Sequence, residues 1–369
     1  MEIKKLDDAC EVEYGTRVVQ QKDGGTKYPV YGGGGATFSL DEFNREDSLV
    51  IARFAMSKQC TRFIKGKFFL NDSGLTVKPK NNDELNQEYL NYQLVYLNDQ
   101  IYSLSRGTAQ RNLNVPKFRN LEISFPKSLA DQIKIANILS KAESLIEQRK
   151  QSIALLDELL KSTFLEMFGD CTTNKKKLKI VELKYFGEII TGNTPPRNND
   201  DNYASKFIEW IKTDNIPSDN TYITSAVEYL SESGLKFART VESGALLVAC
   251  IAGSIQSVGR AALTNRKVSF NQQINAIQPN DEVVPLFLYW LFKISRKYVQ
   301  DAASNGMKKI LTKGGFEKIK MIKPPIELQI QFANIVTKTE ALKEQYKNSL
   351  QELENLYGSL SQKAFRGEL

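Results

Sequence analysis

Arginine, lysine, asparagine and glutamine are the residue types of this chain with the clearest chemical use, because they can hydrogen-bond base edges. They supply the donor and acceptor pairs that discriminate base pairs in the major groove of DNA. Candidates occur in polar segments of both halves of the chain: Arg53, Arg106, Gln110, Arg111 and Asn112 in the first half, and Lys212, Arg260, Asn271, Gln272, Gln273, Lys308 and Lys309 in the second. Taken singly, each is more often a surface or structural residue, and a lysine contacts phosphate more often than a base.

Catalysis is the other chemistry to consider, and the composition disfavours it. The 369 residues include no histidine, which excludes Ser–His and Cys–His nucleophilic pairs and histidine-ligated metal sites. The run Gly32–Gly35 is followed by Ala36 and Thr37, not by the lysine and hydroxyl residue of a phosphate-binding loop, so we expect a turn there. Pairs of carboxylates lie in polar loops, where they give little support for general acid–base catalysis. The sequence therefore predicts no catalytic, cofactor-binding or metal-binding residue in this chain.

The cysteine spacing and the apolar segments indicate the compartment. Four cysteines, at positions 10, 60, 171 and 250, lie far apart, which is typical of isolated buried thiols in a reducing compartment. The start, MEIKKLDDACEVEYG, lacks the apolar run of a secretory signal. The most apolar stretch, GALLVACIAG at 244–253, is half of the roughly 20 residues that a membrane helix needs. We expect a buried strand there and a cytoplasmic protein without membrane contact.

The chain contains an internal repeat. Residues 132–168 and 329–365 align without a gap at an offset of 197 and are identical at 16 of 37 positions. Some identities lie away from the apolar stripe, such as Asn137 with Asn334. Two unrelated amphipathic helices would share a stripe but not these polar residues. Duplication is therefore the explanation that we adopt.

Both copies of the repeat predict a long helix. Each follows a proline boundary, FPKSLADQ at 125–132 and KPPIELQ at 323–329. Side chains recur at alternating steps of four and three, which is typical of a coiled-coil seam, and a second apolar flank indicates more than one neighbouring helix. The predicted seam residues are Ile138, Leu145, Leu156 and Leu159 in the first helix and Ile335, Leu342, Leu353 and Leu356 in the second, and the flank is Ile146, Ile153 and Leu160.

The segments before the helices match one another more faintly, as Leu6 and Gly15 do with Leu183 and Gly192 at an offset of 177. Both mix β-rich and helical runs with loops rich in glycine, asparagine and proline, so the predicted fold class is α+β (mixed α/β). If the second helix packs on the first, the helices form an antiparallel pair with approximate two-fold symmetry between the halves. The predicted segments are a globular domain at 1–126, a helix at 127–170, a second domain at 171–325 and a second helix at 326–369.

The net positive charge lies in one half of the chain. The chain has 50 Lys+Arg and 43 Asp+Glu, for a net charge of +7. Residues 171–325 hold 22 basic and 14 acidic residues, whereas residues 1–126 hold 17 and 16. The second domain is therefore a plausible polyanion binder, with a merely soluble basic surface as the alternative.

Several segments together resemble the DNA-specificity subunits of type I restriction-modification systems. They are YPVYGGGG, TGNTPPRN followed by FIEWIKTDNI, DQIKIANIL with its partner PPIELQIQFANIV, LKSTFLEMFGD and SLSQKAFRGEL, and they extend over nearly the whole chain. The resemblance implies two target-recognition domains that each read one half of a split, asymmetric site in double-stranded DNA. It also implies that two methyltransferase subunits dock on the helices and bring S-adenosylmethionine, and that restriction (motor-nuclease) subunits join for cleavage.

Two expectations follow from this resemblance. The helices should act as a spacer that holds the half-sites roughly 34 Å apart, about one duplex turn or a little less, so that longer helices lengthen the unread gap. The near neutrality of residues 1–126 departs from the pattern, and DNA contacts there should depend on few charges and on partner subunits.

The competing interpretation is a coiled-coil adaptor whose two globular heads bind proteins rather than DNA. A self-contained enzyme would require activity from the isolated chain.

Overall fold

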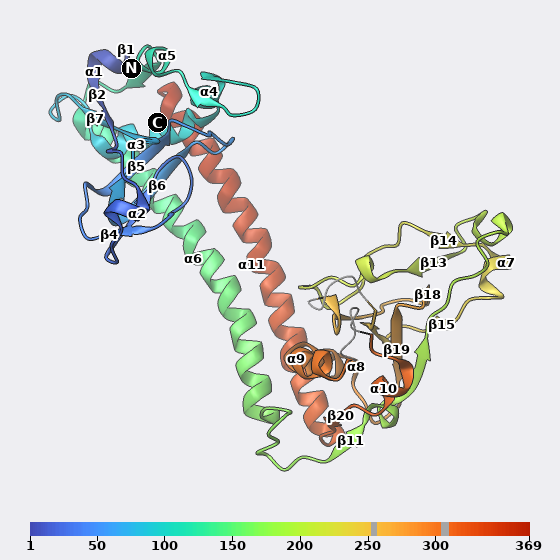
Figure 1. The fold of residues 1–369 in the computed structure, drawn as a ribbon. Coiled ribbons are helices and arrows are strands. Elements are labelled where there is room, and N and C mark those ends of the chain that lie inside the picture. Colours follow the sequence, from blue (N-terminus) through green and yellow to red (C-terminus); the bar gives the residue numbers. More distant parts are fainter. Residues whose placement is uncertain (252–256, 304–309) are drawn as a thin grey trace. The chain divides into compact units, whose positions relative to one another are not determined.

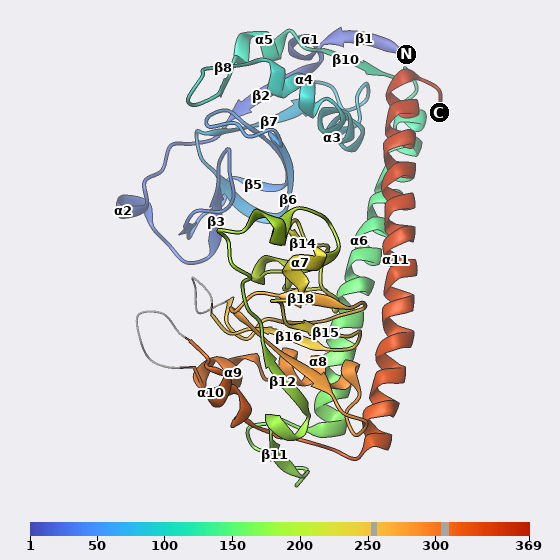
Figure 2. The same cartoon turned by 90° about the vertical axis from the view of Figure 1, so that its right-hand side faces the viewer.

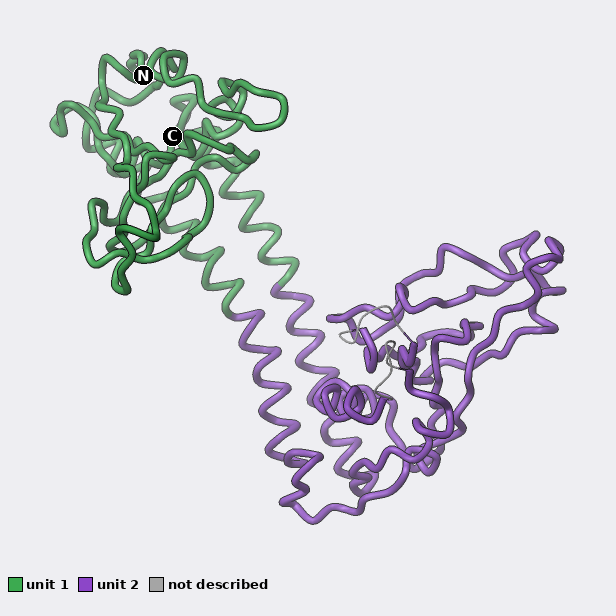
Figure 3. Tube along the Cα trace, viewed as in Figure 1, with its two compact units in different colours: residues 1–151, 347–369 green, residues 152–346 purple. Residues whose placement is uncertain are grey.

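The structure, a computed structural model, describes residues 1–251, 257–303 and 310–369. The chain forms two compact units, one of residues 1–151 with 347–369 and the other of residues 152–346 (Figure 3). Both units mix sheet and helix, which confirms the predicted α+β class.

The first unit is built on a six-stranded sheet with the strand order β2-β7-β5-β6-β3-β4, in which only β3 and β6 run parallel. Its strands are β2 Cys10–Tyr14, β3 Tyr28–Tyr31, β4 Ser39–Leu40, β5 Arg45–Ala52, β6 Thr61–Leu70 and β7 Gly74–Pro79. Two antiparallel ribbons are β1 Glu2–Lys5 with β10 Glu122–Phe125 and β8 Ser105–Arg106 with β9 Asn112–Leu113. The short helices are α1 Leu6–Ala9, α2 Gln20–Asp23, α3 Gln87–Tyr96, α4 Asn98–Ser103 and α5 Val115–Arg119.

The end of the chain belongs to the core of the first unit. Helix α3 begins where the Asn86 side chain accepts a hydrogen bond from the backbone N–H of Tyr89, a favourable N-cap. The Tyr89 ring is fully buried, and its centroid lies 5.5 Å from that of Phe365. Phe365 and the buried Ala364 share one apolar cluster with Leu139. The C-terminus therefore lies in the first unit, as the antiparallel arrangement predicts (Figure 1).

The second unit divides its strands between two four-stranded sheets, with the orders β12-β19-β16-β17 and β14-β13-β18-β15, and one ribbon, β11-β20. The strands are β11 Ile180–Glu182, β12 Gly187–Thr191, β13 Ile208–Ile211, β14 Tyr229–Leu230, β15 Thr240–Val241, β16 Leu246–Ala249, β17 Ala261–Leu263, β18 Val268–Phe270, β19 Ile274–Pro279 and β20 Lys320–Ile322. Its helices are α7 Glu232–Leu235, α8 Pro285–Ile294, α9 Arg296–Asp301 and α10 Lys313–Glu317, with 3-10 turns η1 Leu183–Tyr185, η2 Asp200–Tyr203 and η3 Thr213–Asn215.

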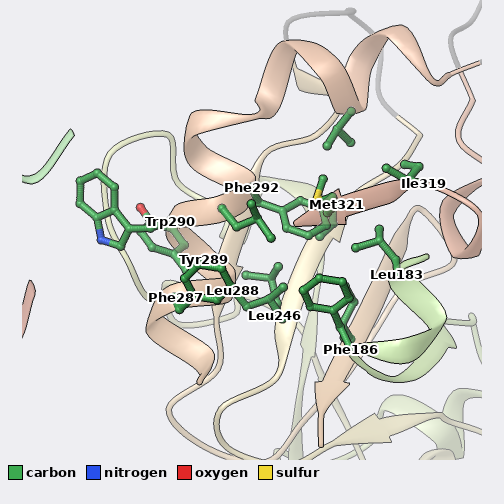
Figure 4. Close-up of a cluster of buried hydrophobic side chains, with 14 of the residues drawn as sticks. Leu183, Phe186, Leu246, Phe287, Leu288, Tyr289, Trp290, Phe292, Ile319 and Met321 are labelled. Atoms are coloured by element: carbon green, nitrogen blue, oxygen red, sulfur yellow. The ribbon is translucent and has the colours of Figure 1, made fainter. Parts of the chain in front are cut away.

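Helix α8 is the centre of the second core. It is apolar around most of its circumference, so it is buried on both sides. Figure 4 shows Phe292 among Leu246, Phe186 and Met321, with Trp290 turned to the other side of the helix. The strand expected in the stretch 244–253 is present as β16, and all four of its residues are buried.

The two units repeat one turn in detail. Asn71 and Asn271 each follow a strand and accept a hydrogen bond on Oδ1 from the backbone two residues on, at 2.9 and 3.1 Å. Gly15 and Gly192 pack against these turns. A Cβ at Gly15 would lie 1.9 Å from the Asn71 carbonyl oxygen, and one at Gly192 would lie 2.1 Å from that of Asn271. This close approach requires glycine and explains the faint match in the sequence.

A buried glutamine joins each long helix to its unit. Helix α6 spans Leu129–Phe168 and α11 spans Ile326–Arg366, and the equivalent Gln132 and Gln329 lie in their first turns, fully buried. Gln132 Nε2 donates to the carbonyls of Glu84 and Pro126 at 2.8 and 2.7 Å, and its Oε1 accepts from Asn86 N at 2.8 Å. Gln329 makes the matching three bonds, at 3.1, 2.8 and 3.0 Å.

The long helices lie antiparallel and side by side within each unit (Figures 1 and 2). In the first unit the start of α6 packs on the end of α11, with Leu139 and Phe365 in one cluster. In the second unit the end of α6 packs on the start of α11, where the Phe164 and Phe332 centroids lie 5.3 Å apart. Because each helix is divided between two cores, the compact units do not coincide with the four segments expected from the sequence.

The predicted helix seam needs correction. Five of its eight residues are exposed, at 36–50%: Leu145, Leu159, Ile335, Leu342 and Leu356. Only Ile138, Leu156 and Leu353 are half-buried. Buried positions include Leu139 and Leu160, which follow Ile138 and Leu159 by one position, and Leu160 belongs to the predicted flank. A spacing of four and three residues is compatible with either face of each helix. The face that is buried is the one that the two units cover.

Candidate nucleic-acid interface

An open cavity of about 1000 Å³ brings together most of the candidates from the first half of the chain. Arg53, Arg106, Gln110 and Asn112 line it, together with Lys117. Its lining includes no aspartate or glutamate, although the surrounding residues 1–126 are nearly neutral. The cavity thus gathers cations and amides without an acidic side chain, which suits an anionic ligand.

Arg53 is the best-positioned cation of this cavity. Its guanidinium carbon lies 4.4 Å from the Phe54 ring centroid and 5.0 Å from that of Tyr14. Nη1 donates to the Asp72 carbonyl at 3.0 Å. Flanking rings and a fixed hydrogen bond restrict the rotamers of the arginine, so less side-chain entropy is lost when it binds a ligand.

Asn112 and Arg111 have structural contacts beside the cavity. Asn112 Oδ1 accepts a hydrogen bond from the backbone N–H of Ala55 at 3.1 Å, and Ala55 has a φ of 49°. A positive φ is unfavourable for alanine, so this bond holds the turn that presents Phe54. The Arg111 guanidinium carbon lies 4.9 Å from the Tyr102 ring centroid. Arg111 is not among the lining residues of the cavity.

The second unit carries a cationic and aromatic cluster around Trp210. The guanidinium carbon of Arg197 lies 4.8 Å from the Trp210 ring centroid and 4.4 Å from that of Tyr203. Lys212 Nζ lies 5.2 Å from the same Trp210 centroid. Glu228 pairs with both cations, with Arg197 at 2.7 Å. The hydrogen bond from Lys212, followed by that from Arg197, holds the pKa of Glu228 below its usual value against the opposing effect of burial.

The remaining candidates of the second half have different environments. Arg260 Nη2 donates to the Thr213 carbonyl at 3.2 Å, next to Lys212. Gln272 is exposed and accepts from Thr194 Oγ1. Gln273 is half-buried, and its Oε1 accepts from Asn271 Nδ2 at 3.1 Å.

Two groups of candidates need separate comment. Asn271 is a correction: it is only 6% exposed and its side chain stabilises the repeated turn, so it is not a surface base reader. Lys308 and Lys309 lie outside the described residues.

Sequence reasoning missed the aromatic members of both clusters and Arg197. Tyr14, Phe54 and Trp210 are single aromatic residues in strand or loop segments, and such residues ordinarily belong to a core. The one available signal for Arg197 was its place after two prolines in TGNTPPRN, a rigid turn that presents a side chain to solvent. The arrangement depends on residues distant in sequence, such as Glu228, and no local pattern identifies it.

Other sites have little support among the described residues. No group of three or more cysteine, aspartate or glutamate side chains that could hold a metal occurs in the part of the chain that the structure describes. Cys10, Cys60 and Cys250 are buried free thiols, and burial raises the pKa of Cys250 to about 12. Among the helices described, none is both long and apolar enough to cross a membrane.

Each long helix also exposes a stripe that the two repeat copies share. In α6 it consists of Ile133, Asn137, Lys141, Leu145 and Gln148, and in α11 of the identical Ile330, Asn334, Lys338, Leu342 and Gln345. All ten are exposed. Three residues of the first stripe, Ile133, Asn137 and Lys141, line a hollow of about 430 Å³. Fold stability does not require identity at exposed positions, so the two stripes have the character of one binding surface present twice.

These features define a duplicated protein with two α+β units, each with cations over aromatic rings, and two long helices. The chain belongs to the type I restriction modification DNA specificity domain family, whose model matches residues 1–156 and 175–355. It is 32% identical over 151 residues to the type I restriction enzyme HindI specificity subunit of Haemophilus influenzae, a match that covers 40% of this chain and 32% of that protein. It is 24% identical over 287 residues to the putative type I restriction enzyme MjaX specificity subunit of Methanocaldococcus jannaschii, covering 72% of this chain and 64% of that one.

Solved structures share the fold. The S subunit of a type I restriction-modification system from M. genitalium superposes with a TM-score of 0.63 at 18% identity, over 99% of this chain and 96% of that chain. A chain from a type I R-M system whose complex assembly and conformational transition were described superposes with a TM-score of 0.60 at 17% identity, over 100% and 98% of the two chains.

Proposed function

We propose that this chain is the non-catalytic specificity subunit of a type I restriction-modification complex and acts in the cytoplasm. In this proposal each compact unit reads one half of a bipartite, asymmetric site in double-stranded DNA. The observation that carries it is the carboxylate-free cavity of the first unit, which gathers Arg53, Arg106 and Lys117 with amide side chains. The Trp210 cluster of the second unit supports the same use, because it places two cations over one aromatic ring.

The exposed stripes support docking of two methyltransferase subunits, one on each repeat copy. Identical residues on two surfaces suit two copies of one partner. In this proposal the partners supply S-adenosylmethionine and the catalytic groups, and restriction subunits join for cleavage. Helices α6 and α11 continue without a break from one unit into the other, so a heptad inserted in both should lengthen the unread gap between half-sites.

Methylation mapping tests this function directly. The chain is co-expressed with its neighbouring methyltransferase gene in a host without DNA methylation, and methylated adenines are mapped across the genome. We expect a bipartite motif with two unlike halves. An assembled, active complex that methylates no such motif would reject the proposal, as would salt-insensitive or sequence-independent retention of DNA. A protein-binding adaptor would produce no sequence-selective retention at all.

A further inference from the structure

The cavity of the first unit has more structure than contact with a duplex requires. We propose that it binds a single unstacked nucleotide of the bound DNA, with the base against the rings of Tyr14 and Phe54 and the phosphate toward Arg106 and Lys117. This inference rests on the proposed function and assigns a particular site within it.

The ring arrangement carries the first step. The guanidinium of Arg53 lies close to two aromatic rings, 4.4 Å from the Phe54 centroid and 5.0 Å from the Tyr14 centroid. Tyr14 is 44% exposed and Phe54 is half-buried, so both retain accessible ring surface at the cavity. Aromatic and guanidinium planes together form the stacking platform that proteins use for single bases. A base inside a duplex has both faces covered by its neighbours and cannot use such a platform.

The second step concerns the hydrogen-bonding groups beside the rings. Asn112 Oδ1 is occupied by the Ala55 N–H, so its Nδ2 is the group that remains for a ligand. Gln110 is exposed at the same cavity. Amides of this kind pair with the edge of an unstacked base, and the lining cations neutralise its phosphate.

The third step is the fixed backbone. Ala55 keeps a φ of 49° directly after Phe54, and the Asn112 bond holds it there. Backbone in this region is unfavourable for alanine and persists where the surrounding structure imposes it. The platform is therefore formed before ligand binds. Arg53 corresponds to the buried Cys250 of the second unit, because both residues donate the same backbone hydrogen bond. Arg53 N donates to Ser73 O and Cys250 N donates to Gln273 O, both at 2.8 Å. Among the described residues, the position of Arg53 therefore has no cationic counterpart in the second unit.

Fluorescence of 2-aminopurine tests the proposal on the complex with its methyltransferase partner. The analogue is placed in turn at each position of the half-site read by the first unit, and unstacking increases its emission. The methyltransferase extrudes its own target adenine, so an increase at that position is set aside. We expect a further increase at one other position, and its loss in Arg53→Ala and Phe54→Leu. Lys65→Ala and Phe63→Leu are matched controls, because these exposed residues lie on the same unit outside the cavity lining. An abasic site opposite that position should tighten binding about tenfold, because no pair has to open.

The outcomes separate this proposal from the function on which it rests. Footprints over both half-sites with no fluorescence increase that depends on Arg53 would overturn the nucleotide pocket and leave the specificity function intact. Absence of any footprint would reject the specificity function itself. Titration with dAMP in the absence of DNA distinguishes the other source of the same chemistry. Saturable, Arg53-dependent binding of dAMP without a fluorescence increase in DNA would assign the cavity to a free nucleotide and overturn our assignment.

Discussion

Arg53 and Arg197 reach the same arrangement from positions that the repeat does not relate. Each guanidinium lies within 5.0 Å of two aromatic centroids. Arg197 also pairs with Glu228, whereas no carboxylate lines the cavity of Arg53. The two heads thus share a scaffold but present cations in different electrostatic surroundings. Unlike half-sites are the expected consequence.

Glu209 allows a prediction about stability and pH. Its side chain is 13% exposed, and it pairs with Arg266 through two hydrogen bonds, one of them 2.9 Å long. The bond from Arg266 lowers the pKa of Glu209 from 4.5, against burial. A lowered folded-state pKa stabilises the fold above about pH 4.5, and that contribution is lost as pH falls through the folded value.

We therefore expect Glu209→Gln to lower the free energy of unfolding at pH 7 by about 1.5–3 kcal/mol. Below the folded pKa the variant and the parent chain should converge. Urea unfolding monitored between pH 3 and 7 measures both effects. Glu242→Gln is the control, because its pair with Lys267 is exposed at 63% and contributes little. A constant difference between variant and parent at every pH would contradict the ion-pair explanation.

At the scale of elements, Gln132 and Gln329 connect each long helix to its unit. Replacement of either by alanine leaves a backbone N–H and two carbonyls without their partner, and we expect a loss of about 1–3 kcal/mol for each variant. Gln345→Ala should change stability by less than about 0.5 kcal/mol, because this residue is exposed. Urea unfolding measures all three. Equal midpoints for Gln329→Ala and Gln345→Ala would refute the proposed connection.

The elements also show how far the sequence could lead. The repeat, the two helices, the antiparallel pairing and the buried strand at β16 could all be predicted, because they depend on local periodicity and on an alignment of the chain with itself. The seam residues could not be, since the four-three spacing of Leu145 and Leu342 does not say which face the rest of the chain covers. The burial of Asn271 could not be predicted either, because its turn packs against Gly192, 79 positions away. The clusters around Arg53 and Trp210 depend on similar long-range contacts.

At the scale of the whole molecule, the two exposed stripes predict the stoichiometry of the complex. Leu145→Asp alters the stripe of α6, and Leu342→Asp alters that of α11. A buried aspartate without a partner is unfavourable at an apolar interface, so each single variant should bind one methyltransferase subunit and the double variant none. Mass measurement of the purified complexes gives the count. Leu155→Asp is the matched control, because Leu155 is 66% exposed on α6 but its repeat counterpart is Glu352. If Leu155→Asp removed a subunit as readily as Leu145→Asp, or if the double variant still bound two, the repeated stripes would not be the docking surfaces.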